Sequence, residues 1–179
     1  MGAAKGLIYL HSNGMVHGDL KGVCFGRSNY PDALTNLPAQ ANILIDEAGN
    51  ACLTDFGLLT ILSDPANLLS SSSNSQGGSA RWMSPELIVP EEFGFEKYRA
   101  TVSSDCYALG MVVYEVISGN IPFHKSTKFG ASLKVLRGER PHRGSGFTES
   151  LWKMLEWCWT SHPDDRPNVE SVLQCLETD

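Results

Sequence analysis

A nearly uninterrupted apolar run from Cys106 to Ile117 constrains the fold of this chain more than any other feature. Glu115 is the one charged residue in it, and Ser118 and Gly119 follow as a helix stop signal. A helix that is apolar on all sides is buried in protein, and this run is too short to cross a bilayer. We therefore expect a buried helix in a single domain, which 179 residues with 42% hydrophobic content suffice to form.

Further helices and one hairpin are predicted around this run. Apolar residues at helical spacing predict a helix over residues 3–12, which Asn13 and Gly14 end. Two short apolar runs, 43–45 and 51–53, flank a polar turn and predict a β-hairpin. Three more amphipathic helices are predicted, at 132–136, 151–159 and 169–176. The expected fold is mainly α-helical, with a small β-hairpin.

The charge of the chain excludes some classes of partner. Its 14 basic and 20 acidic residues give a net charge of −6, which argues against a nucleic-acid-binding surface. The first residues lack the apolar core of a secretion signal, and the chain shows no membrane-spanning run. We expect no membrane partner and, by default, a cytoplasmic location.

Side chains suited to phosphoryl transfer follow one another between residues 15 and 57. His17, Gly18 and Asp19 lead to Lys21, and Asn42 precedes an Asp-Phe-Gly triplet at 55–57. A carboxylate can orient a hydroxyl acceptor, and a lysine can stabilise charge on the transferred phosphate. An amide and a second carboxylate supply the hard oxygen ligands that Mg²⁺ prefers. This order of residues indicates phosphoryl transfer from a nucleotide to a hydroxyl.

These motifs resemble those of the protein kinase family, and other motifs of the family follow in the same order. Ser-Pro-Glu at 84–86 is similar to the family's Ala-Pro-Glu, and 104–110 is similar to the start of its long buried helix. Asp-Arg-Pro at 165–167 contains the arginine that pairs with Glu86 in the family. The resemblance extends from about residue 3 to residue 176. It implies the α-helical C-terminal lobe of a protein kinase.

The resemblance also implies roles for individual residues. Asp19 is expected to be the catalytic base, and Lys21 to contact the transferred phosphate of ATP. Asn42 and Asp55 are expected to bind Mg²⁺ and, through it, the nucleotide. Four supporting roles are also implied. His17 anchors the catalytic loop, and Asp105 binds the backbone of that loop. Glu86 and Arg166 form an ion pair, and Ser79 serves substrate docking.

Specificity and control follow from smaller features of the same resemblance. Lys21 and the segment 78–86 are similar to those of the tyrosine-kinase-like group of serine/threonine kinases, and 90–101 is similar to kinases of filamentous fungi. Residues 58–86 correspond to the activation and substrate-docking segment. Gly18 stands where the family usually has an arginine, so phosphorylation of this segment is not expected to be the main control.

The spacing between Asp19 and Asn42 departs from the family pattern. The family places this asparagine five residues after the aspartate, whereas here it follows by 23. Removing residues 23–40, which show no sustained helical or strand period, restores the motif. Valine codons begin with GT and one glutamine codon is CAG, so this segment could be a short retained intron. The alternative is a surface loop, which is tolerated because loop-closure entropy grows slowly with length.

The family's glycine-rich loop and phosphate-binding strand lysine do not occur in these 179 residues. We therefore expect the N-terminal lobe to be missing and this chain itself to be inactive. The expected cofactors are ATP and Mg²⁺, and the expected partner is a protein substrate, with regulatory domains upstream. The alternative is a non-catalytic half-kinase that binds substrates or a full-length relative.

Overall fold

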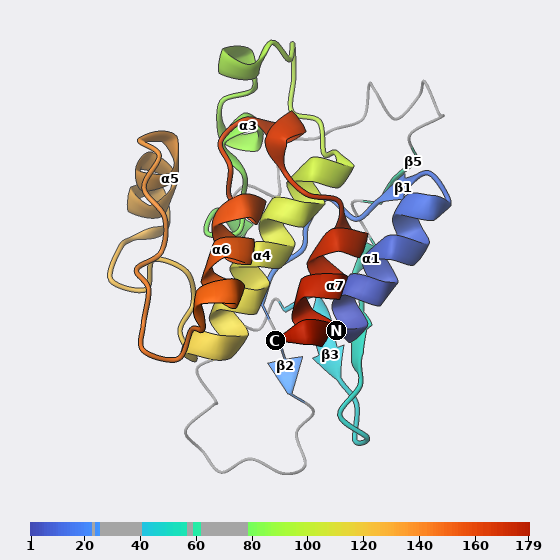
Figure 1. Ribbon diagram of the computed structural model, residues 1–179. Coiled ribbons are helices and arrows are strands. Elements are labelled where there is room, and N and C mark those ends of the chain that lie inside the picture. Colours follow the sequence, from blue (N-terminus) through green and yellow to red (C-terminus); the bar gives the residue numbers. More distant parts are fainter. Residues whose placement is uncertain (23, 26–40, 57–58, 62–78) are drawn as a thin grey trace.

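The computed structural model of the chain describes residues 1–22, 24–25, 41–56, 59–61 and 79–179 (Figure 1). Most of the predicted insertion at 23–40 lies outside the described residues. So does 62–78, which makes up much of the predicted activation segment.

Four helices form the body of the molecule, with α4 (Val102–Ser118) at its centre. α4 contacts α6 (Glu149–Cys158) and α1 (Gly2–Ser12), and α7 (Val169–Thr178) contacts both α1 and α6 (Figure 1). The predicted mainly helical fold is confirmed. The shorter helical elements are α3 (Pro85–Ile88), η5 (Pro90–Phe93), α5 (Lys128–Leu136) and η6 (Pro163–Asp165).

The central apolar run forms a buried helix, as predicted. Tyr107 and Met111 are fully buried, and Gly119 ends the helix in a left-handed conformation. The helix begins four residues before the apolar run, because Thr101 and Ser104 form a reciprocal capping box through their side chains and backbone N–H groups. This polar first turn of α4 carries Asp105.

Glycine allows α4 and α6 to approach closely. A Cβ atom at Gly110 would lie 2.8 Å from Cβ of Cys158 and 2.9 Å from Nε1 of Trp159. Both neighbours are almost fully buried, so neither can move away without disturbing other contacts. The position of α6 against the central helix therefore depends on the absence of a side chain at residue 110.

Among the residues that the structure describes, two small sheets lie beside the helices. β3 (Ile43–Ile45) and β4 (Ala51–Leu53) form the predicted hairpin, and β1 (Met15–Val16) pairs with β5 (Thr60–Ile61). Within the segment 23–40, which shows no sustained strand period, β2 (Cys24–Phe25) pairs in parallel with β3. Two residues are too few to show a strand period, and their pairing uses backbone groups. Within the described residues, no helix combines the length and apolar character needed to cross a membrane.

Candidate active site

Asp105 fixes the predicted catalytic loop to the first turn of α4. Its carboxylate accepts hydrogen bonds from the backbone N–H groups of His17 and Gly18, both at 2.9 Å. A third contact, also at 2.9 Å, joins the same carboxylate to Nε2 of His11 in the last turn of α1. Asp105 is 1% exposed, so the loop, α1 and α4 are joined through one buried group.

Gly18 and Tyr98 hold the other side of the loop. Gly18 has a φ of 77°, a left-handed conformation that glycine adopts without steric cost. The hydroxyl of Tyr98 donates to the Gly18 carbonyl at 3.2 Å. Burial, with smaller contributions from the negative charges of Asp19 and Asp105, raises the pKa of Tyr98 to about 12, so the hydroxyl remains a donor. No role for Tyr98 was predicted, although it lies within the segment 90–101 that is similar to kinases of filamentous fungi.

The carboxylate of Asp19 brings together three of the other predicted site residues. Its Oδ1 accepts a hydrogen bond from the hydroxyl of Ser79. Its Oδ2 accepts from Nζ of Lys21 at 2.5 Å and from Nδ2 of Asn42 at 3.1 Å. Ser79 and Asn42 are buried, and the side chains of Asp19 and Lys21 are only 9% and 11% exposed. The cluster therefore holds one oriented carboxylate that solvent reaches only slightly.

Asn42 reaches this cluster although 22 residues separate it from Asp19 in the sequence. Its Nδ2 also donates to the Asp19 carbonyl at 2.6 Å, and its backbone N–H donates to the Lys21 carbonyl at 2.9 Å. If Gly22 were joined to Ala41, Lys21 and Asn42 would be the first and fourth residues of a β-turn, already carrying the hydrogen bond of that turn. The ends of the segment 23–40 thus lie in the geometry that a shorter, family-like loop requires.

Deletion of residues 23–40, with Gly22 joined to Ala41, is expected to leave the chain folded. Shortening the loop should stabilise it by about 1–2 kcal/mol through loop-closure entropy. Loss of the two-residue β2 pairing offsets part of this gain. Thermal unfolding should show a melting temperature equal to that of the full chain or a few degrees above it.

A chain whose residues 23–40 are replaced by a glycine-serine linker of the same length separates the effects of length and sequence. Both variants should keep the far-ultraviolet circular dichroism of the original. A deletion variant that fails to fold, beside a linker variant that folds, would show that the loop cannot be shortened at this point. Failure of both would make 23–40 an integral part of the structure.

Asp55 follows Thr54, which is hydrogen-bonded to Asn42. The backbone N–H of Thr54 donates to the Asn42 carbonyl at 2.9 Å, and the Thr54 carbonyl lies 3.2 Å from Nε2 of the fully buried His17. Asp55 itself is exposed and has a φ of 59°, a left-handed conformation that aspartate tolerates better than most residues. The ring of Phe56 lies 5.9 Å from that of His17. His17 therefore holds the segment that carries the second predicted metal ligand.

The two predicted ligands have the chemistry that Mg²⁺ requires. Because Nδ2 of Asn42 is used by Asp19, the amide oxygen is the atom left for a metal. The Asp55 carboxylate is exposed. In the part of the chain that the structure describes, no group of three or more His, Cys, Asp or Glu side chains could hold a metal ion. A magnesium ion here would complete its coordination with water and phosphate oxygens, as is usual for this metal.

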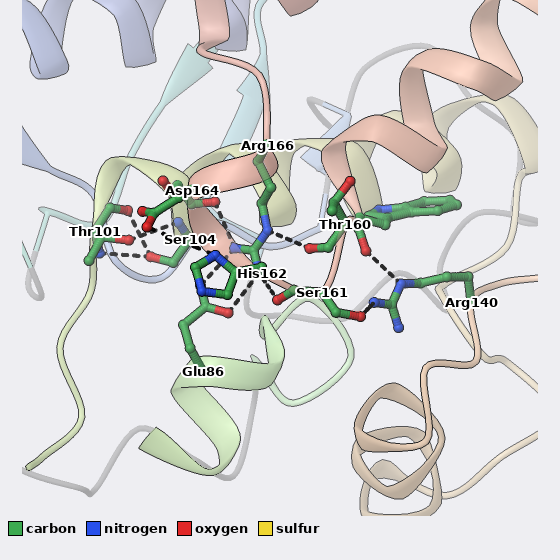
Figure 2. Close-up of polar contacts among 11 residues, drawn as sticks. Glu86, Thr101, Ser104, Arg140, Thr160, Ser161, His162, Asp164 and Arg166 are labelled. Atoms are coloured by element: carbon green, nitrogen blue, oxygen red, sulfur yellow. Dashed lines mark hydrogen bonds and ion pairs between the residues drawn. The ribbon is translucent and has the colours of Figure 1, made fainter. Parts of the chain in front are cut away.

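The segment after Ser79 is attached to the helical body by a buried ion pair. Both guanidinium NH₂ groups of Arg166 donate to the Glu86 carboxylate at 2.7 Å, and the two side chains are 0% and 1% exposed. Figure 2 shows Arg166 reaching across to α3, with its Nε donating to the Thr160 carbonyl at 2.8 Å. Further bonds go to the carbonyls of Ser103 and Ser161. The geometry is the bidentate pair that the sequence predicted.

Arg81 makes a second attachment, which the sequence analysis missed. Its guanidinium donates to the backbone carbonyls of Pro122, Phe123 and Ser126 at 2.6–2.9 Å. Nothing in the pattern of residues identifies carbonyl groups 41–45 positions away as its acceptors. Arg81 therefore connects the segment that contacts Asp19 to the loop between α4 and α5.

A helical body holds a carboxylate, a lysine, an amide and a second carboxylate, which are the groups that protein kinases use in phosphoryl transfer. Residues 36–176 match the family model described as protein tyrosine and serine/threonine kinase. The chain belongs to the protein kinase family. Members of this family use ATP and a divalent metal ion, and they phosphorylate proteins.

Individual relatives agree with this assignment. The chain is 34% identical to the dual specificity protein kinase pyk3 of Dictyostelium discoideum, over 97% of this chain and 11% of the relative. It is 32% identical to the mitogen-activated protein kinase kinase kinase mkh1 of Cytospora mali, over 94% of this chain and 8% of the relative. It is 28% identical to the serine/threonine-protein kinase STY17 of Arabidopsis thaliana, over 97% of this chain and 25% of the relative. The chain thus spans at most a quarter of the length of these relatives.

Proposed function

We propose that this chain is the acceptor-binding and metal-binding part of a kinase that transfers the γ-phosphate of ATP to serine and threonine hydroxyls of proteins. The observation that carries the proposal is the convergence of Lys21, Asn42 and Ser79 on the carboxylate of Asp19. Asp19 is the acceptor that these three donors share, and a protein hydroxyl would approach it through the 9% of its side chain that is exposed.

Each residue of the cluster has a distinct role in the proposed reaction. Asp19 accepts the proton of the acceptor hydroxyl, and Lys21, whose ammonium lies 2.5 Å from Asp19, stabilises negative charge beside it. Asn42 orients Asp19 with its amide nitrogen, and its oxygen and Asp55 together provide the ligands for Mg²⁺. When bound, Mg²⁺ and ATP supply the activated phosphoryl group.

The preference for serine and threonine is supported by Lys21 and Ser79. Ser79 is 5% exposed and its hydroxyl donates to Asp19, which restricts the space beside the catalytic carboxylate. A short aliphatic hydroxyl then reaches Asp19 more readily than the hydroxyl of a long phenol ring. One relative is named a dual specificity kinase, so acceptor preference has to be measured directly.

The 179 residues contain no glycine-rich loop, so we propose that they do not catalyse transfer alone and that another segment holds the nucleotide phosphates. A chimera tests the function under this condition. The small lobe of pyk3, which precedes the region that resembles this chain, is joined to Met1. The purified chimera is incubated with radiolabelled ATP, Mg²⁺ and matched peptides that contain one serine, one threonine or one tyrosine.

Incorporation into the serine and threonine peptides, with little into the tyrosine peptide, is the expected result. Equal labelling of the tyrosine peptide would contradict the proposed preference but not the kinase activity. A folded chimera that binds ATP and labels none of the peptides would favour the alternative, an interaction module without catalysis.

A further inference from the structure

A basic cleft lies on the side of the molecule that carries α5. Its residues are distant from Asp19 in the sequence. It has a volume of about 680 Å³ and lies between the end of α4, the loop that follows it, α5, and the loop that leads to α6. In Figure 1 this region is at the left, where α5 stands at the edge of the molecule. Six basic side chains line the cleft: His124, Lys125, Lys134, Arg140, His142 and Arg143.

The charge of the cleft is opposite to that of the whole chain. Four lysines and arginines line it against a single carboxylate, Glu139, in a chain whose net charge is −6. Such a separation of charge attracts ligands of the opposite sign and raises their rate of association.

Two of the four permanent cations have a carboxylate partner and two do not. Lys134 lies 3.8 Å from Glu139, and Arg143 lies 2.7 Å from Glu149. Among the described residues, no ion pair is formed by Lys125 or Arg140. The first is exposed, and the second donates only to neutral groups, including the Trp159 carbonyl at 2.9 Å and the Ser161 hydroxyl at 3.1 Å (Figure 2). The ammonium of Lys125 is therefore available to a ligand, whereas Arg140, whose guanidinium also lies over the ring of Tyr107, contributes a positive charge that no carboxylate in the described part of the chain neutralises.

The wall of the cleft is connected to the proposed active site. Phe123 and Ser126 line the cleft, and their carbonyls accept hydrogen bonds from Arg81. Arg81 lies two residues after Ser79, which donates to Asp19. The wall of the cleft and the segment that contacts Asp19 are thus held together through the buried Arg81 side chain.

We propose that this cleft binds an acidic segment of the protein substrate, a proposal that rests on the kinase function proposed above. Carboxylates of the segment pair with Lys125 and Arg140 and accept hydrogen bonds from the exposed rings of His124 and His142. Phe147 and Tyr114, whose rings are stacked at 5.4 Å, supply an apolar wall for the peptide backbone and any apolar side chain.

Peptide binding to the 179-residue chain tests the proposal without nucleotide or catalysis. A fluorescent glutamate-rich peptide is titrated and followed by anisotropy, beside a glycine-serine peptide and a lysine-rich peptide of the same length. Only the glutamate-rich peptide should bind, and added salt should weaken its binding. Equal binding of all three peptides, or no binding at all, would overturn the proposal. Tighter binding of a single-stranded oligonucleotide of the same charge would overturn the assignment to an acidic protein segment.

Charge reversal at Lys125 locates the binding. Lys125→Glu should weaken binding of the glutamate-rich peptide by about 5–30-fold, because an attraction between charges becomes a repulsion. Lys5→Glu makes the same change in charge on α1, where the side chain is 64% exposed, and should have less than about a twofold effect. His142→Glu serves as a second cleft variant should Lys125→Glu misfold. Equal affinities for the cleft and α1 variants would place the peptide elsewhere.

The active chimera links the cleft to substrate choice. A serine peptide that carries a glutamate-rich extension should have a lower KM than the same peptide without it. Lys125→Glu should remove this difference and leave kcat unchanged. Equal KM values in a chimera that is otherwise active would overturn the inference while the proposed kinase function stands. An inactive chimera beside specific peptide binding would instead point to a failure of the proposed function.

Discussion

Arg166→Met is expected to lower the free energy of unfolding by about 3–5 kcal/mol, because it leaves a buried carboxylate without its partner. Glu86 is 1% exposed and receives two hydrogen bonds of 2.7 Å from Arg166. The same substitution removes the donors to the carbonyls of Ser103, Thr160 and Ser161. Since a domain of this size is stabilised by only about 5–15 kcal/mol, a large part of its stability would be lost.

Urea unfolding of Arg166→Met measures this loss, and Arg143→Met is its matched control. Arg143 also forms an ion pair of 2.7 Å, but with Glu149, whose side chain is 65% exposed. Removing that pair should shift the urea midpoint far less, because water replaces the lost contact. Equal shifts for the two variants would contradict a structural role for the buried pair.

A second substitution separates the lost charge from the lost packing. In the double variant Glu86→Gln/Arg166→Met, a neutral amide replaces the carboxylate that Arg166→Met leaves buried and unpaired. The double variant should therefore recover part of the lost stability. If it were no more stable than Arg166→Met alone, the bonds from Arg166 to the backbone carbonyls would be the main source of the stabilisation.

Local pattern predicted the longer helices and the hairpin of β3 and β4, while the boundaries of these elements depended on polar contacts. The apolar run from Cys106 identified α4, but its start at Val102 depends on the capping box of Thr101 and Ser104. β2 consists of two residues, which are too few to show a period, and it pairs with β3 through backbone groups. The periodicity of apolar residues indicates which side chains are buried. It does not predict a helix start or a strand pairing that depends on hydrogen bonds.

Resemblance to a family predicted the residues of the candidate site but not all that positions them. Asp19 and Asn42 belong to motifs, and the structure brings them into contact across 23 positions. Tyr98 and Arg81 instead act through contacts with backbone carbonyls at Gly18 and in the loop after α4. A carbonyl acceptor is present at every residue, so the sequence carries no mark of which one a side chain will reach.

Asp19→Asn in the chimera is expected to lower kcat by roughly 10²–10⁴-fold with little change in the KM for ATP. An amide oxygen can still accept the hydrogen bond of Ser79 and the side chain keeps its size, although the amide nitrogen cannot accept from Lys21 and Asn42 as Oδ2 does. The amide cannot take a proton from the acceptor hydroxyl, and it no longer offers a negative charge to Lys21 at 2.5 Å. Initial rates with the serine peptide at saturating ATP measure the effect.

Asp46→Asn is the matched control for this substitution. Asp46 is also an aspartate on a turn, exposed between β3 and β4, where it accepts hydrogen bonds from the backbone and side chain of Asn50. Its replacement removes the same charge at a distance from the cluster and should leave kcat nearly unchanged. If Asp19→Asn kept more than a tenth of the activity while Asp46→Asn behaved like the parent, Asp19 would not be the base. Lys21 and Asn42 would then be arranged around Asp19 for structural support, and the proton of the hydroxyl would have to leave with the phosphate or to water.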